Sequence, residues 1–257
     1  MPAAPRDPAL QVLRTGSLAS IARGQAPRTI LPFGLPAIDA WLPEGGLVGG
    51  ALHEVAGGGG SAVNVACATL FAAGIMARSP GHILWCATQS DLFAPALAQA
   101  GLDPDRVIYA TADDDSALLA CFEEGLRHGG LGGVVAEVAR LSMIASRRLQ
   151  LAAESTGTMA IALRRWRHAA SALDFGRPTA AVTRWRVSAL PSATLPVREV
   201  GPARWCIELI RNRAGECTNF VMEACDATGH LCLPSDLAYR SLTPACDPSG
   251  TGKRTAA

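Results

Sequence analysis

Four consecutive glycines, Gly57 to Gly60, lie between an apolar segment at residues 51–56 and a long apolar segment at residues 62–77. A strand, a glycine loop and a helix in this order are typical of a phosphate-binding loop, where backbone N–H groups and a helix N-terminus converge on an anion. In the pattern G-x-x-x-x-G-K-[ST], however, Ala62 stands at the lysine position and Val63 at the hydroxyl position. The sequence therefore predicts a degenerate phosphate-binding loop made of Ala56, Gly57, Gly58, Gly59, Gly60, Ser61, Ala62 and Val63.

The lysine content supports this interpretation. The only lysine of the chain is Lys253, near the C-terminus, so no internal lysine can replace the missing phosphate ligand. The segment 249–253 resembles such a loop, but no strand precedes it and no helix can follow it. We expect it to belong to a disordered tail. The expected protein is therefore not an ATP-hydrolysing enzyme and carries neither a cofactor nor a metal.

Other residue patterns that could carry chemistry have simpler explanations. His53 and Glu54 lack the second histidine of H-E-x-x-H, because position 57 is glycine, so we interpret the pair as structural. Three aspartates, 113–115, precede a predicted helix and are expected to cap it. His128, followed by two glycines, is expected at a helix C-terminus.

The net charge of +1 hides a strong asymmetry along the chain. Residues 1–139 carry seven arginines against 13 acidic residues, whereas residues 140–213 carry 13 arginines against four. A basic middle section favours one cationic face, suited to nucleic acid or to an acidic partner. The alternative is a set of solvated arginines spread around the surface. Trp166 and Trp185 lie in the densest arginine clusters and are expected to be partly exposed.

The composition is that of a folded globular protein, with 49% hydrophobic and 18% charged residues among 257. The eight cysteines form no C-x-x-C pair and lie mostly in apolar runs, which favours reduced thiols in a cytoplasmic protein. Residues 1–30 contain no continuous apolar signal segment. The segment 62–77 is too short for a comfortable membrane span and follows a glycine loop, so we expect a buried helix and no membrane contact.

Apolar runs alternate with helical patterns after the glycine loop. We expect strands at residues 51–56, 81–86, 106–110, 133–138 and 158–163, and helices at 62–77, 92–100, 114–128 and 142–154. Such an order is typical of a parallel sheet covered on both faces. Three later segments, 180–189, 203–211 and 218–224, alternate in polarity and predict antiparallel strands that finish the sheet.

The predicted organisation has three parts. Residues 1–30 hold an amphipathic helix, 9–23, and a linker. This helix is expected to serve self-association or partner binding, and the alternative is that it covers its own domain. Residues 31–240 form the α/β domain, and residues 241–257 form the tail.

The order of elements over residues 31–233 resembles the RecA-type core. The segment 34–39 is similar to its entry motif, 45–50 to the turn before the phosphate-loop strand, and 211–213 to a basic-Asn-basic stretch. More narrowly, segments 53–57, 163–167, 180–187 and 210–213 resemble the ImuA family, RecA- and SulA-like accessory proteins of SOS-induced translesion mutagenesis. This implies a mostly parallel central sheet flanked by helices, with antiparallel strands at its C-terminal end.

The chain departs from a working RecA-type ATPase. The acidic base expected after the second core strand falls at residues 88–90, Thr-Gln-Ser, and the Walker-B acid falls at Glu137. With the phosphate-loop lysine and hydroxyl also absent, we interpret Glu137 as vestigial.

The resemblance implies a non-catalytic adaptor. Its implied partners are an ImuB-type inactive Y-family polymerase, RecA and, through them, an error-prone C-family polymerase. The loop after residues 158–163 corresponds to a DNA-contacting loop of RecA, so single-stranded DNA is a further candidate partner. The expected DNA- or partner-binding residues are Arg164, Arg165, Trp166, Arg167, His168, Arg184, Trp185, Arg186, Arg211 and Arg213. The alternatives are a weak DNA-dependent ATPase and a SulA-like inhibitor of cell division.

Overall fold

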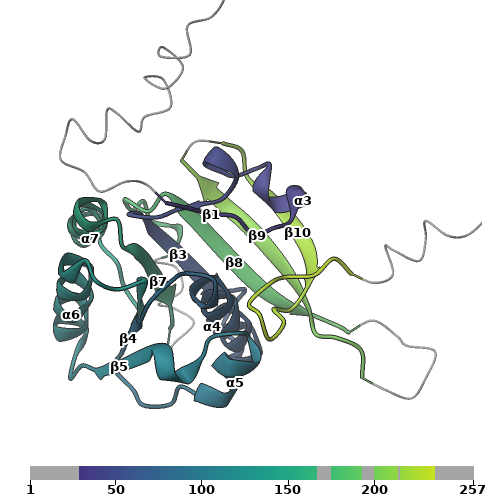
Figure 1. Ribbon diagram of the computed structural model, residues 1–257, viewed down its shortest axis with the longest axis horizontal. Helices are drawn as coiled ribbons and strands as arrows, with labels where there is room; N and C mark the ends of the chain where they lie inside the picture. The colour runs from purple at the N-terminus through teal and green to yellow at the C-terminus, as the bar shows by residue number, and fades with distance from the viewer. Residues whose placement is uncertain (1–28, 167–174, 193–199, 214, 235–257) are drawn as a thin grey trace, which may run out of the picture.

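The fold is built around one eight-stranded sheet, seen in a computed structural model that describes residues 29–166, 175–192, 200–213 and 215–234 (Figure 1). The strands lie in the order β10-β9-β8-β3-β7-β6-β4-β5. Their bounds are β3 Leu52–Gly57, β4 Ile83–Ala87, β5 Val107–Thr111, β6 Gly133–Val138, β7 Met159–Arg164, β8 Thr183–Leu190, β9 Arg204–Asn212 and β10 Thr218–Glu223. A small antiparallel pair, β1 Ile30–Leu31 and β2 Leu47–Val48, precedes them.

The sheet is parallel from β5 to β8 and antiparallel beyond β8. The expected mostly parallel α/β core with antiparallel strands at its C-terminal end is confirmed. One detail was wrong. β8 was predicted as antiparallel, but it runs parallel to β3, pairing His53 with Thr183, and antiparallel only to β9. The long connection between β7 and β8 allows this, because it returns the chain to the end of the sheet where β7 began.

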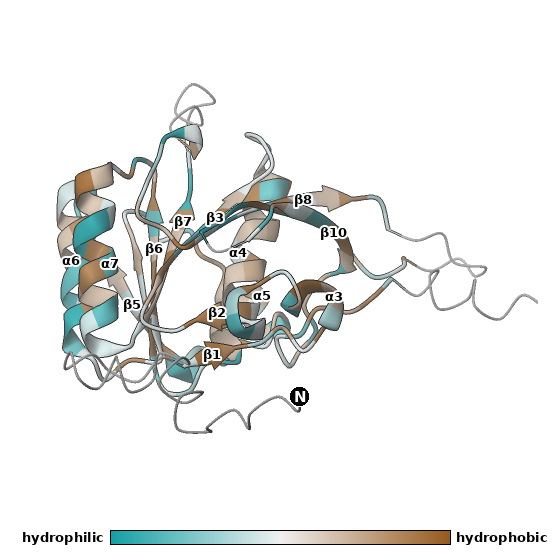
Figure 2. Ribbon diagram, turned by 90° about the horizontal axis from the view of Figure 1, so that it is seen from above, coloured by the Kyte–Doolittle hydropathy of each residue, from teal (hydrophilic) through white to brown (hydrophobic). Residues whose placement is uncertain are grey.

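Helices cover both faces of the sheet. Figure 2 shows α6 (Asp115–His128) and α7 (Met143–Thr156) on one side and α4 (Ala62–Ala77) and α5 (Ala94–Gln99) on the other. Each face has its own apolar cluster: Phe71, Trp85 and Trp185 belong to the α4 side, and Phe122 and Leu149 to the α6–α7 side. The 16 residues of α4 follow the predicted range, since the segment is apolar almost throughout and eight of its residues are buried.

The helix ends follow local chemistry. Asp114 caps α6 by accepting hydrogen bonds from Ser116 N and Ala117 N, both at 2.8 Å, which confirms its predicted structural role. The helix ends at His128, as expected, and Gly129 adopts the left-handed conformation that terminates it. Ser142 caps α7 in the same way.

The entry segment, which includes α3 (Pro36–Asp39), joins the α4-side apolar cluster through Phe33 and Ile38. The Asp39 carboxylate accepts three backbone hydrogen bonds, from Phe33, Gly34 and Leu35, at 2.7–3.1 Å. The Phe33 ring then contacts Phe71 and Trp185. This part of the entry motif therefore stabilises a turn that places an aromatic anchor in the core.

The predicted N-terminal helix at residues 9–23 and the tail at 241–257 lie outside the described residues. Within the described ranges, every helix is too short or too polar to cross a membrane.

Candidate functional site

The glycine loop joins β3 to α4 at the carboxyl end of the parallel strands, where ligands of open α/β sheets usually bind. Glu137 lies near the carboxyl end of β6, and β7 separates that strand from β3. The two predicted halves of the site, the glycine loop and Glu137, therefore lie at the same edge of the sheet.

The loop uses part of its backbone in internal hydrogen bonds. Gly58 N donates to Val187 O at 2.8 Å, and Gly59 N donates to Gly57 O at 3.0 Å. The Asn64 side chain closes the loop against β8, since its amide nitrogen donates to Gly58 O and its oxygen accepts from Ala189 N at 2.9 Å. Fewer N–H groups are consequently free to converge on an anion.

Close packing alone accounts for glycine at two positions of the loop, without any role in ligand binding. A Cβ atom on Gly57 would lie 2.7 Å from the Asn64 backbone, and one on Gly58 would lie 1.8 Å from Ser188 Oγ. Gly59 has a φ of 93°, which L side chains rarely adopt. Ala62 and Val63, at the positions of the missing lysine and hydroxyl, are exposed in the first turn of α4 and offer no polar side-chain atom.

Glu137 is buried and both of its oxygens accept hydrogen bonds from protein donors. Trp85 Nε1 donates to Oε1 at 3.0 Å and Arg165 Nη1 donates to Oε2 at 2.6 Å. Arg165 also holds Asp91, with Nη1 at 2.8 Å from Oδ1 and Nη2 bonded to Oδ2. The hydrogen bonds to Asp91 and then to Glu137 raise the pKa of Arg165, so its guanidinium stays charged. Sequence reasoning missed Asp91, which follows β4 just beyond the expected acid positions 88–90.

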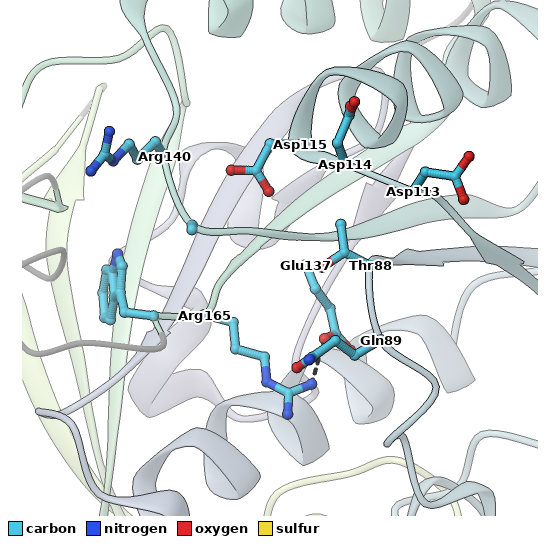
Figure 3. Close-up of a pocket in the computed structure, with 10 residues that line it drawn as sticks. Thr88, Gln89, Asp113, Asp114, Asp115, Glu137, Arg140 and Arg165 are labelled. Carbon is cyan, nitrogen blue, oxygen red and sulfur yellow. Dashed lines mark hydrogen bonds and ion pairs between the residues drawn. The ribbon is translucent and has the colours of Figure 1, made fainter.

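Two of the cavities at this edge of the sheet adjoin the predicted site. The larger, of about 670 Å³, is lined by Thr88, Gln89, the three aspartates 113–115, Glu137 and Arg140. The smaller, of about 390 Å³, is lined by Gly60 and Ala62 of the loop and by apolar residues of α4 and α5. Arg165 and Trp166 line both cavities. Figure 3 shows Arg165 reaching toward Glu137 while Arg140 points away from that pair.

A second carboxylate, Glu54 of β3, lies in a fully buried network. Arg164 Nη1 is 2.9 Å from its Oε2, and Arg184 Nη2 is 3.0 Å from its Oε1. Thr179 Oγ1 also donates to Oε1. Arg184 further donates to the carbonyl oxygens of Phe175 at 2.6 Å and Arg177 at 2.9 Å. The network ties the ends of the connection between β7 and β8 to the central strand.

The neighbouring His53 is structural, as predicted. It is 1% exposed, with Nε2 at 3.0 Å from Val48 O and Nδ1 at 2.7 Å from Thr183 Oγ1. Burial lowers its pKa from 6.5 to about 4, so the ring is neutral at neutral pH.

The predicted DNA- or partner-binding residues separate into three groups. Trp185, Arg164 and Arg184 are 0%, 1% and 5% exposed, so the expectation that they form a surface was wrong. Trp185 points into the α4-side core, and Arg164 and Arg184 both pair with the buried carboxylate of Glu54.

The second group lies nearer the surface but is already bonded. Arg165 pairs with two carboxylates, and Arg186 pairs with Glu208 across β8 and β9 at 2.6 Å. Arg211 and Arg213 donate to the carbonyl oxygens of Thr179 and Ala180. Trp166 is half-buried and packs edge-on against Phe175 with ring centroids 5.5 Å apart. The third group, Arg167 and His168, lies outside the described residues, and DNA binding there stays a prediction.

Over the described part of the chain, no three His, Cys, Asp or Glu side chains are grouped so that they could hold a metal ion. The strand order and the helices on both faces define a RecA-like α/β domain, and its glycine loop contains no lysine.

Comparison with known proteins gives the family. The chain is 36% identical over 216 residues to Protein ImuA of Caulobacter vibrioides strain NA1000 / CB15N, an alignment that covers 80% of this chain and 87% of the relative. The same values hold for Protein ImuA of strain ATCC 19089 / CIP 103742 / CB 15. The chain belongs to the ImuA family. No family model matches it.

Proposed function

We propose that this protein is a non-catalytic RecA-like adaptor in SOS-induced, error-prone translesion DNA synthesis. Membership of the ImuA family supports a role in DNA-damage-induced mutagenesis alongside ImuB. The adaptor would act through protein contacts and would not consume ATP.

The observation that supports this proposal concerns both halves of the predicted nucleotide site: the glycine loop lacks its polar groups, and Glu137 is already hydrogen-bonded to protein donors. Position 62 has no cation to neutralise β- and γ-phosphate charge, and position 63 has no hydroxyl for Mg²⁺. Across the site, both oxygens of Glu137 accept hydrogen bonds from Trp85 and Arg165. Phosphoryl transfer depends on groups positioned around the γ-phosphate and its metal ion, and three of those groups are missing or already paired.

The partners proposed for the adaptor are an ImuB-type inactive Y-family polymerase and RecA, with an error-prone C-family polymerase recruited indirectly. Single-stranded DNA and self-association are further candidates. The deep burial of Arg164 and Arg184 leaves fewer cations for DNA than the sequence suggested, which favours protein contacts as the main interaction.

The test separates chemistry from binding. Purified protein is assayed for ATP turnover with and without single-stranded DNA, and separately for a complex with an ImuB-type protein by size-exclusion chromatography with light scattering. We expect no turnover above background and a stable complex. A saturable turnover that disappears in Glu137→Ala would replace the adaptor with a DNA-dependent ATPase. If the protein shows neither ATP turnover nor a complex with the ImuB-type protein, the proposed partner is wrong.

A further inference from the structure

The glycine loop and Glu137 face two different cavities, although they lie at the same edge of the sheet. Gly60 and Ala62 line the smaller cavity, and Glu137 lines the larger. A nucleotide bound in the RecA manner would have to contact both. The residues between the cavities are Arg165 and Trp166, which directly follow β7, the strand inserted between β3 and β6.

Arg165 is fixed at this position by its backbone and its side chain. Its N–H donates to Val138 O at 3.2 Å, which continues the pairing of β7 with β6 by one residue. Its guanidinium then bridges Glu137 and Asp91, which lie on different segments of the chain. One cation between two carboxylates has the charge arrangement that a bound metal ion would otherwise provide.

We propose that Arg165 is a built-in counter-ion that keeps the degenerate nucleotide site shut. Its guanidinium occupies the cation position beside Glu137, and together with Trp166 it divides the space that a nucleoside triphosphate and its divalent cation would need. Nucleotide is thus excluded by a side chain that fills the site, in addition to the missing lysine. This goes beyond the adaptor role, which requires only that ATP is not hydrolysed.

An ordinary surface ion pair is a weaker explanation of this contact. The chain offers such a pair for comparison, Arg186 with Glu208, whose side chains are 42% and 27% exposed. In the Arg165 pair, the Arg165 side chain is 30% exposed, but the Glu137 side chain is only 5% exposed and also accepts the Trp85 indole N–H. A buried carboxylate strongly requires a counter-charge, so removal of Arg165 should leave a site that recruits another cation.

Terbium luminescence tests the proposal, because Trp85 lies within hydrogen-bonding distance of Glu137 and would sensitise a Tb³⁺ ion bound there. Wild-type protein should give no saturable Trp-sensitised signal. Arg165→Ala should bind Tb³⁺ at least about tenfold more tightly, and Mn²⁺ should compete. Arg165→Lys should not bind Tb³⁺, since the lysine ammonium keeps the positive charge beside Glu137. Arg186→Ala is the matched control and should behave like wild type.

Two outcomes would overturn the proposal: equal Tb³⁺ affinity in wild type and Arg165→Ala, or undiminished affinity when Glu137→Gln is added to Arg165→Ala. Thermal unfolding is measured for every variant. If Arg165→Ala does not fold, Arg165→Gln serves in its place, with the same expected gain in affinity. If wild-type protein binds Tb³⁺ at this site but does not hydrolyse ATP, this inference is wrong and the proposed adaptor role still stands.

Discussion

Glu54 and Arg164 form an ion pair 2.9 Å long in which both side chains are completely buried. The carboxylate belongs to the central strand β3 and the guanidinium to the end of β7, so the pair joins two adjacent parallel strands at the loop side of the sheet. Arg184 of β8 reaches the same carboxylate from the opposite neighbour. A single acidic side chain therefore serves as counter-ion to two cations inside the protein.

Replacing Glu54 should destabilise the protein strongly. In Glu54→Gln, two buried guanidinium groups lose their counter-charge, and breaking a buried pair typically costs about 3–5 kcal/mol. Urea unfolding followed by circular dichroism measures the loss. Glu208→Gln, which breaks the exposed pair with Arg186, should cost less than about 1 kcal/mol. Similar losses in the two variants would contradict the role assigned to the buried network.

Single-stranded DNA binding has to be tested without Arg164, because its loss would perturb folding as well as binding. Arg140, which is exposed, and Arg167 are suitable targets. If both contact phosphates, the double alanine variant should reduce the slope of log affinity against log salt by about 1.4. Fluorescence anisotropy with a labelled oligonucleotide gives this slope. Arg127→Ala, on the surface of α6, is the control. An unchanged slope would assign these arginines to a protein partner or to solvent.

Restoring the loop chemistry alone should not restore nucleotide binding. Ala62→Lys with Val63→Thr rebuilds the missing motif residues, but Arg165 still occupies the cation position. We expect measurable Mg²⁺-dependent binding of a fluorescent ATP analogue only when Arg165→Ala is added. Tight binding by the two loop substitutions alone would show that the missing lysine and hydroxyl were the only barrier and that Arg165 does not exclude nucleotide.

Acid should destabilise the protein through His53. Its pKa is about 4 in the folded state against 6.5 in the unfolded chain, so the unfolded state binds more protons between these values. Stability is therefore present above pH 6.5 and is lost as the pH falls toward 4. From pH 7 to pH 5 the loss is about 2 kcal/mol. Unfolding curves of wild type and His53→Gln at both pH values measure it, and an equal loss in the two proteins would assign the effect to other groups.

The fold was largely predictable because its elements follow local patterns. The apolar segment after the glycine loop gave the range of α4, and the run Gly133–Val138 gave β6. The burial of Arg164 and Arg184 was not predictable in this way. Their shared partner, Glu54, is 110 and 130 residues distant in sequence, and only the pairing of β3 with both β7 and β8 brings the three together.

The site was predicted only in part for a related reason. The pattern identified Glu137 and the loop, but nothing local indicates that Arg165 turns back toward an acid on β6. Arginines in a basic segment look alike in sequence, and their roles differ according to which carboxylate the sheet places beside them. Arg165 meets Glu137 and Asp91, whereas Arg186 meets Glu208 on a neighbouring strand.

The closeness of Gly58 to Ser188 has a consequence for how such loops change over time. A side chain at position 58 would displace the Ser188 hydroxyl of β8, and one at position 57 would collide with the backbone of α4, whether or not a nucleotide is ever bound. The lysine and the hydroxyl can be replaced at little structural cost, because their positions face solvent. A lineage that no longer uses ATP can therefore lose the lysine and the hydroxyl at little structural cost, whereas replacing Gly57 would disturb the packing of the loop against α4.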